Sequence, residues 1–458
     1  MHSTTHLDGH LDILGQQPLL QIYTQICLCF PVADASSQPA IIETLGRGME
    51  RLSASFPWIA YQVVNEGAKE RNTGTFKIIP FKKTPPLNFV DLRLDSSTPT
   101  MDELRRANFP MSMLDETFVA PRNTVPGSRG ESPSETTPVF LVRATSIIGG
   151  LLLTFLGQHQ SMDGTGLGQV IHLFSKACRN EPFTSEELYS GNLPRRDLIP
   201  LLDDYKPGPE VARQILKPSP STDSTNTTPA PPPCTWANFT FSAASLAALK
   251  SLATQALAPS TSYISTDDAL TAFIWQSVTR ARQPRLNPST ESKFARAVDV
   301  RHHMGVPETY PGLLQNMTYH GYTVQQLIEA PLGHVASELR SALDPQTSKL
   351  ERDTRALATL LSRTPDKLTV SFIASVDMSA GLMLSSWVKQ KCYEEDFGLG
   401  LGMPESVRRP RFSDFESLVY LLPKARDGAI AVAICLRDDD MARLRADEEF
   451  MKYGEFDG

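Results

Sequence analysis

Long apolar runs and paired cysteines are scarce in this chain of 458 residues. The longest apolar stretch, residues 147–156, contains two glycines and is too short to span a bilayer. The first residues show no basic segment followed by an apolar run, so no secretory signal is recognisable. We therefore expect a cytoplasmic protein with no membrane partner.

Sequence motifs typical of metal sites and stripes of basic residues are also absent. The six cysteines are scattered, with no C-x-x-C pair and no spacing typical of a metal site. This pattern predicts reduced thiols and no bound metal. The net charge of -7 is small for this length, and no Lys/Arg-rich stripe is present. These features argue against nucleic acid as a partner.

Several common catalytic signatures are absent. Without a G-x-S-x-G elbow, a serine-hydrolase triad is disfavoured. Without G-x-x-x-x-G-K-[ST], a loop that binds nucleotide phosphates is disfavoured too. Residues 164–168 (GTGLG) supply only part of the dinucleotide fingerprint, so we predict no bound cofactor there.

The residues that are present indicate a globular α/β protein. Apolar residues make up 41% of the chain and charged residues 21%. Strand and helix patterns alternate through both halves, which predicts layered α/β structure. Residues 56–64 and 73–79 are among the predicted strands. A helix cap is predicted at Thr266-Asp267-Asp268.

One compositional break divides the chain. Residues 217–233, KPSPSTDSTNTTPAPPP, contain nothing that can bury apolar area, and their prolines favour an extended linker. Long loops without structure are uncommon inside one compact unit. We therefore predict domains at residues 1–216 and 236–458, joined by a crossover linker at residues 217–235.

The most informative stretch is residues 139–178. It has the pattern of two strands around a Gly149-Gly150 turn, then a polar loop that begins at His159, then an amphipathic helix. A histidine at the end of a buried strand is held rigidly, as a general base requires. Asp163 follows four residues later, a spacing that does not by itself require contact with the imidazole. A hydrogen-bonded core histidine is the structural alternative.

A second glycine-rich stretch, residues 396–402 (DFGLGLG), follows an apolar segment that ends in Ser385-Ser386-Trp387. Its residues tolerate unusual backbone angles, which predicts a sharply bent and closely packed loop. We expect the loop to be structural.

These two motifs together carry a family resemblance. His159-x-x-x-Asp163-Gly164 with Asp396-Phe397-Gly398-Leu399-Gly400 resembles the acyl-CoA-dependent acyltransferases of the BAHD superfamily. Over nearly its whole length the chain looks like the fungal trichothecene 3-O-acetyltransferases within it. Other stretches that carry the resemblance include residues 22–26 (IYTQI), 265–275 (STDDALTAFIW) and 310–320 (YPGLLQNMTYH). Two departures are Gln158, where many members have a second histidine, and Leu399, where tryptophan is usual.

The resemblance implies a fold and a set of site residues. The fold would be a monomer of two domains of related chloramphenicol-acetyltransferase-like αβ topology, with a central channel between them. Acetyl-CoA would enter as co-substrate from one face and the acceptor alcohol from the other. Asp163 would turn away from His159 and pair with Arg301. The loop with Asp396, Gly398 and Gly400 would be structural.

The chemistry expected from this arrangement is direct acyl transfer. His159 would accept the proton of an alcohol as its oxygen attacks the thioester. Ser385, Ser386 and Trp387 are candidates for the oxyanion or acceptor site. Ser265 and Thr266 are candidates for contacts with CoA.

The expected function is acetylation of a hydroxyl of a fungal secondary metabolite, with a trichothecene C-3 hydroxyl as the leading acceptor, in toxin biosynthesis or self-protection. An alkaloid or another terpenoid or polyketide alcohol is an alternative acceptor for the same chemistry. A peptide-bond-forming condensation domain shares the histidine motif, but the loop at Asp396 argues against it. The alternative that is not an enzyme is a catalytically inactive relative that only binds a small ligand.

Overall fold

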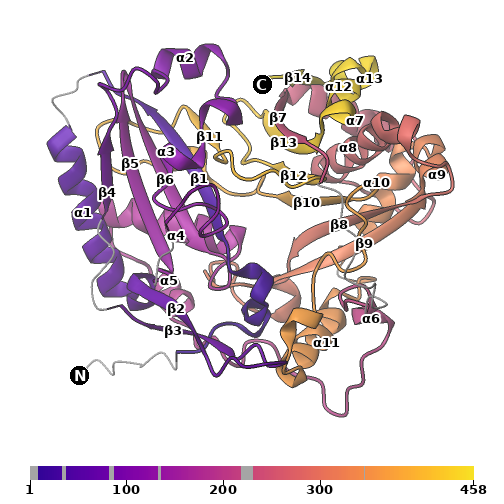
Figure 1. Ribbon diagram of the computed structural model, residues 1–458, viewed down its shortest axis with the longest axis horizontal. Coiled ribbons are helices and arrows are strands. Elements are labelled where there is room, and N and C mark those ends of the chain that lie inside the picture. The colour runs from indigo at the N-terminus through magenta and orange to yellow at the C-terminus, as the bar shows by residue number, and fades with distance from the viewer. Residues whose placement is uncertain (1–8, 34–37, 82–86, 133–135, 218–230, 345) are drawn as a thin grey trace, which may run out of the picture.

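The structure, a computed structural model, describes residues 9–33, 38–81, 87–132, 136–217, 231–344 and 346–458. Most of the predicted linker at residues 217–235 lies outside these ranges. Figure 1 shows the strands of the first half of the chain on one side of the molecule and the helices of the second half on the other.

The first sheet has five strands in the order β11-β1-β6-β5-β4. In that order they span Ser406–Arg408, Tyr23–Pro31, Gly150–Gln158, Phe140–Ile147 and Asn88–Asp91. Helices α1 (Gln38–Ser55) and α4 (Gly164–Cys178) share a core with one face of this sheet, and α2 (Met101–Arg106) and α3 (Glu116–Val119) with the other. Every residue of β6 is therefore buried, and its end is rigidly held.

The second sheet has seven strands in the order β14-β7-β13-β12-β10-β8-β9. In that order they span Gly454–Phe456, Cys234–Phe241, Ile430–Arg437, Leu418–Leu421, Leu382–Ser386, Glu291–Asp299 and Gln315–Thr323. Helix α8 (Thr266–Arg282) is buried along most of its length. It packs among α7 (Ala243–Thr254), α10 (Leu332–Ser341) and α12 (Asp438–Ala446).

Smaller elements complete the fold. Strands β2 (Tyr61–Glu66) and β3 (Thr75–Pro80) form a two-stranded sheet of their own. Further helices are α5 (Ser185–Gly191), α6 (Pro209–Ala212), α9 (Val324–Glu329), α11 (Leu350–Arg363) and α13 (Glu448–Met451). Within the described ranges, no helix is both long and apolar enough to cross a bilayer.

The second half of the chain reaches back into the first. Strand β11 pairs antiparallel with β1, at the edge of the five-stranded sheet (Figure 1). Just before it, Phe397 enters the core of the first half, with its ring 5.6 Å from that of Phe155 on β6 and 5.8 Å from that of Phe174 on α4. The two halves therefore share a hydrophobic core as well as a boundary.

The predicted α/β class is confirmed, and two local predictions need correction. Residues Pro57–Ala60 form a 3-10 turn with proline at its start, so the strand predicted at residues 56–64 begins only at Tyr61. Proline cannot donate a ladder hydrogen bond, which favours the turn. The cap of α8 is Ser265, one residue before the predicted Thr266, because the Ser265 hydroxyl accepts from the backbone N–H of Asp268.

Candidate active site

His159 is the first residue after β6, and two hydrogen bonds fix it there. Its backbone N–H donates to the carbonyl of Ile22 over 2.8 Å. Its ring Nδ1 lies 3.1 Å from the carbonyl oxygen of Met162. A carbonyl can only accept, so Nδ1 carries the hydrogen and Nε2 carries the lone pair. The imidazole is thus held in the tautomer that can take up a proton at Nε2.

The surroundings of His159 keep the imidazole neutral. Burial lowers its pKa below the ordinary value of about 6.5, because the charged form loses hydration. The Met162 carbonyl and the Asp163 carboxylate act in the opposite direction, and the positive charge of Arg409 lowers the pKa further. The imidazole is therefore available as a base at pH 7.

Asp163 faces Arg301, and every hydrogen bond it makes leads away from His159. The guanidinium of Arg301 meets the carboxylate with two parallel bonds of 3.0 Å each. One carboxylate oxygen also accepts from the N–H of Gly166, as the N-cap of α4, and the other from the N–H of Leu314, both over 2.8 Å. Burial lowers the pKa of Arg301, but Asp163 and Asp299 together raise it above its ordinary value. This buried ion pair between Asp163 and Arg301 joins the two halves of the chain, and we call it the latch.

Arg301 also holds the backbone of the loop before β9. It donates to the carbonyls of Tyr310, over 2.8 Å, and Gly312, over 2.7 Å. The start of α4 approaches this loop so closely that a Cβ on Gly166 would lie 2.3 Å from the carbonyl oxygen of Pro311. Gly166, three residues after Asp163, is thus required by a close backbone approach.

Asp12 holds the same loop from the other side, and no sequence pattern pointed to it. Its buried carboxylate accepts from the Tyr310 hydroxyl over 2.5 Å and from the N–H of Leu313 over 3.0 Å. Arg195 pairs with it over 3.0 Å. Burial raises the pKa of Asp12, and Arg195 opposes this rise. Asp12 stands in a polar N-terminal segment without periodicity, so only the fold identifies this anchor.

Ser385 and Ser386, at the end of β10, have different partners. Trp387 donates its indole N–H to the Ser385 oxygen over 3.1 Å, whereas the Ser386 hydroxyl donates to Asp267. No described residue accepts the hydrogen of Ser385, so that hydroxyl can still donate. The Trp387 indole lies against Gly164, where a Cβ would be 3.1 Å from Nε1. Ser385 and Trp387 therefore stand close to the loop that carries His159.

Ser265 and Thr266 lie at the start of α8. The Ser265 hydroxyl is engaged in a capping box with Asp268. Asp268 in turn pairs with Arg296 over 3.0 Å and with Arg340. The contact of Ser265 and Thr266 with CoA stays a prediction.

The Asp396 loop docks on the far end of α4. The Asp396 carbonyl accepts from the Ser175 hydroxyl over 3.0 Å and from Arg179. Gly398 and Gly400 have φ of 67° and 74°, a region that favours glycine. The start of α4 is next to the His159 loop. At 1.5 Å per residue, Ser175 lies about 17 Å further along the helix, so the Asp396 loop is remote from His159.

Arg409 is a second residue that sequence patterns missed. Its guanidinium lies 4.1 Å from the ring centre of Phe412, 4.6 Å from that of Tyr420 and 5.6 Å from that of Trp387. No carboxylate within the described ranges forms an ion pair with it. The aromatic faces attract the cation instead, and its charge acts on His159.

The site places a neutral base at the junction of two interlocked α/β halves and pairs its aspartate with Arg301. This arrangement fits an enzyme that deprotonates a hydroxyl for group transfer. The transferase family model matches residues 111–451, and the trichothecene 3-O-acetyltransferase-like N-terminal domain matches residues 22–178. The chain therefore belongs to the transferase family of BAHD acyltransferases.

Individual relatives agree along the whole chain. It is 60% identical over 454 residues to the O-acetyltransferase dmxR13 of Cryptosporiopsis sp., covering 99% of this chain and 98% of that protein. It is 53% identical to the trichothecene 3-O-acetyltransferase TRI101 of Fusarium sporotrichioides, covering 100% and 98%. The structure of F. graminearum TRI101 with coenzyme A and deoxynivalenol has a TM-score of 0.93 at 49% identity, covering 98% of this chain and 99% of that one.

These comparisons confirm the predicted family, the fold and the enzyme class, an O-acetyltransferase with acetyl-CoA as co-substrate. Vinorine synthase, with a TM-score of 0.67 at 16% identity and coverage of 99% and 95%, shares the fold alone.

Proposed function

We propose that this protein transfers the acetyl group of acetyl-CoA to the C-3 hydroxyl of a trichothecene. The observation that carries the proposal is the neutral His159, with Nδ1 bonded to a carbonyl and Nε2 left to accept a proton. The trichothecene as acceptor rests on the relatives named trichothecene 3-O-acetyltransferase.

The transfer proceeds within a ternary complex. His159 Nε2 accepts the proton of the acceptor hydroxyl while that oxygen attacks the thioester carbonyl. The carbonyl becomes a tetrahedral oxyanion, which collapses with cleavage of the carbon–sulfur bond. The imidazolium returns the proton to the departing sulfur, so the products are the acetate ester and free CoA. Asp163, Arg301 and the Asp396 loop serve as positioning residues for this step.

Ser385 is the proposed donor to the oxyanion. We expect Ser385→Ala to lower kcat by about 10²-fold, near the lower end of the effect of removing one oxyanion donor. Ser386→Ala is the matched control, because its hydroxyl is committed to Asp267. Steady-state kinetics with acetyl-CoA measure both. Equal losses in the two variants would contradict the assignment.

The pH profile of kcat/KM tests the state of His159. Because the base must be neutral and its pKa is lowered, we expect activity to fall only on acidification, with a midpoint below about pH 6.5. Arg409→Met removes a positive charge that disfavours the imidazolium, so its midpoint moves upward. A wild-type midpoint above pH 6.5 would contradict this electrostatic picture.

Acceptor-dependent thiol release tests the function itself. Purified protein with acetyl-CoA is expected to release CoA thiol when a trichothecene with a free C-3 hydroxyl is added. The same compound already acetylated at C-3 should release none, and mass spectrometry should show one added acetyl group. Release that ignores the C-3 hydroxyl would overturn the trichothecene assignment.

The setting of the enzyme is part of the proposal. All six cysteines are free, as expected in a reducing compartment, which supports a cytoplasmic location.

We also propose that the protein acts as a monomer, with domains at residues 1–216 and 236–458. Size-exclusion chromatography with light scattering tests the monomer.

A further inference from the structure

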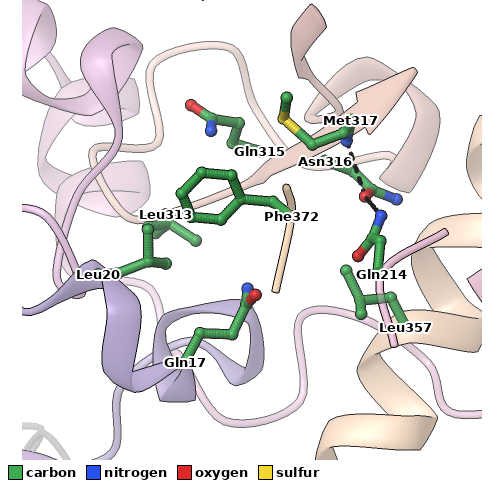
Figure 2. A pocket seen from close by; sticks show the side chains of 9 residues that line it. All are labelled: Gln17, Leu20, Gln214, Leu313, Gln315, Asn316, Met317, Leu357 and Phe372. Carbon is green, nitrogen blue, oxygen red and sulfur yellow. Dashed lines mark hydrogen bonds between the residues drawn. The ribbon is translucent and has the colours of Figure 1, made fainter. Parts of the chain in front are cut away.

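A small cavity lies beside the loop that Arg301 and Asp12 hold. Its walls include Gln17, between the 3-10 turns Ile13–Gln16 and Pro18–Leu20, and Gln214, which follows α6. Leu313, just before β9, and residues 315–317 within β9 complete this side of the cavity. Figure 2 shows these side chains around the space, with Phe372 between them. The cavity volume is about 20 Å³, room for about one water-sized group. It can take one polar group of a ligand and is too small for a ring system.

Two buried oxygen atoms in this cavity lack a donor. Gln17 donates its side-chain N–H to Leu14 over 2.9 Å, and Gln214 donates to Asn316 over 3.0 Å. The side-chain N–H group of each glutamine is therefore engaged, and its Oε1 is the atom left without a partner. Neither Oε1 accepts a hydrogen bond from a described residue, although the two side chains are only 5% and 3% exposed. Buried acceptors of this kind are rare and call for a donor.

The chemistry of the walls restricts the occupant. The lining contains carboxamides and apolar side chains, and no charged residue. Carbonyl, carboxylate and phosphate oxygens cannot donate to the two acceptors. A hydroxyl or an N–H group satisfies them. The occupant is therefore an uncharged donor.

The cavity is built on the segments that position the base. Gln160, the residue after His159, donates to the carbonyls of Gly15 and Gln17, over 3.0 and 3.4 Å. On the opposite wall, Leu313 lies in the loop that holds Asp163 through its next residue. The cavity thus borders segments that hydrogen-bond to Gln160 and Asp163, both on the loop that begins at His159.

We propose that the cavity is a subsite for a second hydroxyl of the acceptor, bound by the side-chain oxygens of Gln17 and Gln214. The proposal rests on the proposed function and deepens it, since it makes the acceptor a molecule with at least two hydroxyl groups. It also gives regiochemistry: the hydroxyl held here keeps its proton and escapes acetylation. An acceptor without a donor at this position leaves both oxygens unpaired.

The test compares two acceptors across matched variants. One is a trichothecene with a second free hydroxyl besides that at C-3, and the other is the analogue with hydrogen in place of that second hydroxyl. We expect wild type to prefer the diol about tenfold in kcat/KM, and Gln17→Met with Gln214→Met to reduce the preference below about twofold. Gln315→Met is the control, because Gln315 lines the same cavity but has no buried oxygen without a donor, and should keep the preference.

Each other outcome is decisive. Equal losses with both acceptors would show that the glutamines act only structurally, and a raised KM for acetyl-CoA would assign the cavity to CoA. Either result overturns the subsite while the proposed function stands. Calorimetric binding of both acceptors to His159→Ala separates the two proposals. Tighter binding of the diol supports the subsite without turnover, and a wild type that neither binds nor acetylates either compound overturns the trichothecene assignment and the subsite with it.

Discussion

Replacement of His159 by alanine is expected to lower kcat/KM by about 10²–10⁴-fold, the contribution of one positioned general base. The loss should appear mainly in kcat, because Nε2 acts on the proton as the new bond forms. Stability should change little, since the ring is partly buried and its one side-chain bond is to Met162. Thiol release from acetyl-CoA in the presence of acceptor measures the rate, and thermal unfolding measures stability.

His172→Ala is the matched control for this experiment. His172 lies on α4, the helix that follows the His159 loop. Its ring Nδ1 is 2.9 Å from a carboxylate oxygen of Glu395, near the Asp396 loop. Its loss should leave kcat/KM within about threefold of wild type, as for a site remote from the chemistry. If His159→Ala kept wild-type turnover, another group would have to be the base.

The second large effect is expected for Asp163→Ala. This change removes the N-cap of α4 and leaves the guanidinium of Arg301 buried without its main partner. Breaking a buried ion pair in this way costs about 3–5 kcal/mol in the free energy of unfolding. The urea midpoint should therefore fall strongly. Activity should fall as well, because the latch joins the His159 loop to the loop before β9.

Two further variants separate charge from capping. Asp163→Asn can still cap α4 but carries no charge, so its loss of stability isolates the electrostatic part. Asp299→Asn removes the other carboxylate beside Arg301. The Asp299 side chain is 41% exposed, so this change should cost less than about 1 kcal/mol. Equal losses for Asp163→Ala and Asp299→Asn would show that the latch is not the main support.

The candidate base was predictable because its signal is local. His159 follows a buried apolar strand and precedes a helix that opens with glycines, and this order is legible in a single stretch of chain. The sharp bend of the Asp396 loop was predictable for the same reason, because its glycines lie within one short stretch of sequence. In the structure these glycines have positive φ. The cap of α8 was misplaced by one residue because Ser265, Thr266 and Asp267 are all good caps, and only hydrogen-bond geometry chooses among them.

Residues that act through distant partners were harder to predict. Arg409 has no motif, and the imidazole on which its charge acts, that of His159, lies in the first half of the chain. Asp12 meets Tyr310 across 298 positions. The orphan oxygens of Gln17 and Gln214 are visible only when both walls of the cavity are in place.

The sequence by itself predicted the α/β class through its periodicity, the family through its resemblance to known acyltransferases, and His159 as the candidate base through its place between an apolar strand and a helix. Only the tertiary structure decided which tautomer His159 adopts, which serine keeps a free hydroxyl and which carboxylates hold the loop before β9. Those outcomes depend on where each side chain points and on the hydrogen bonds that it forms, some of which join residues far apart in the chain. A hydrogen bond is strongest when its donor–H···acceptor angle lies within about 30° of linear. Whether two groups meet that condition is decided by the folded chain, and no local sequence pattern specifies it.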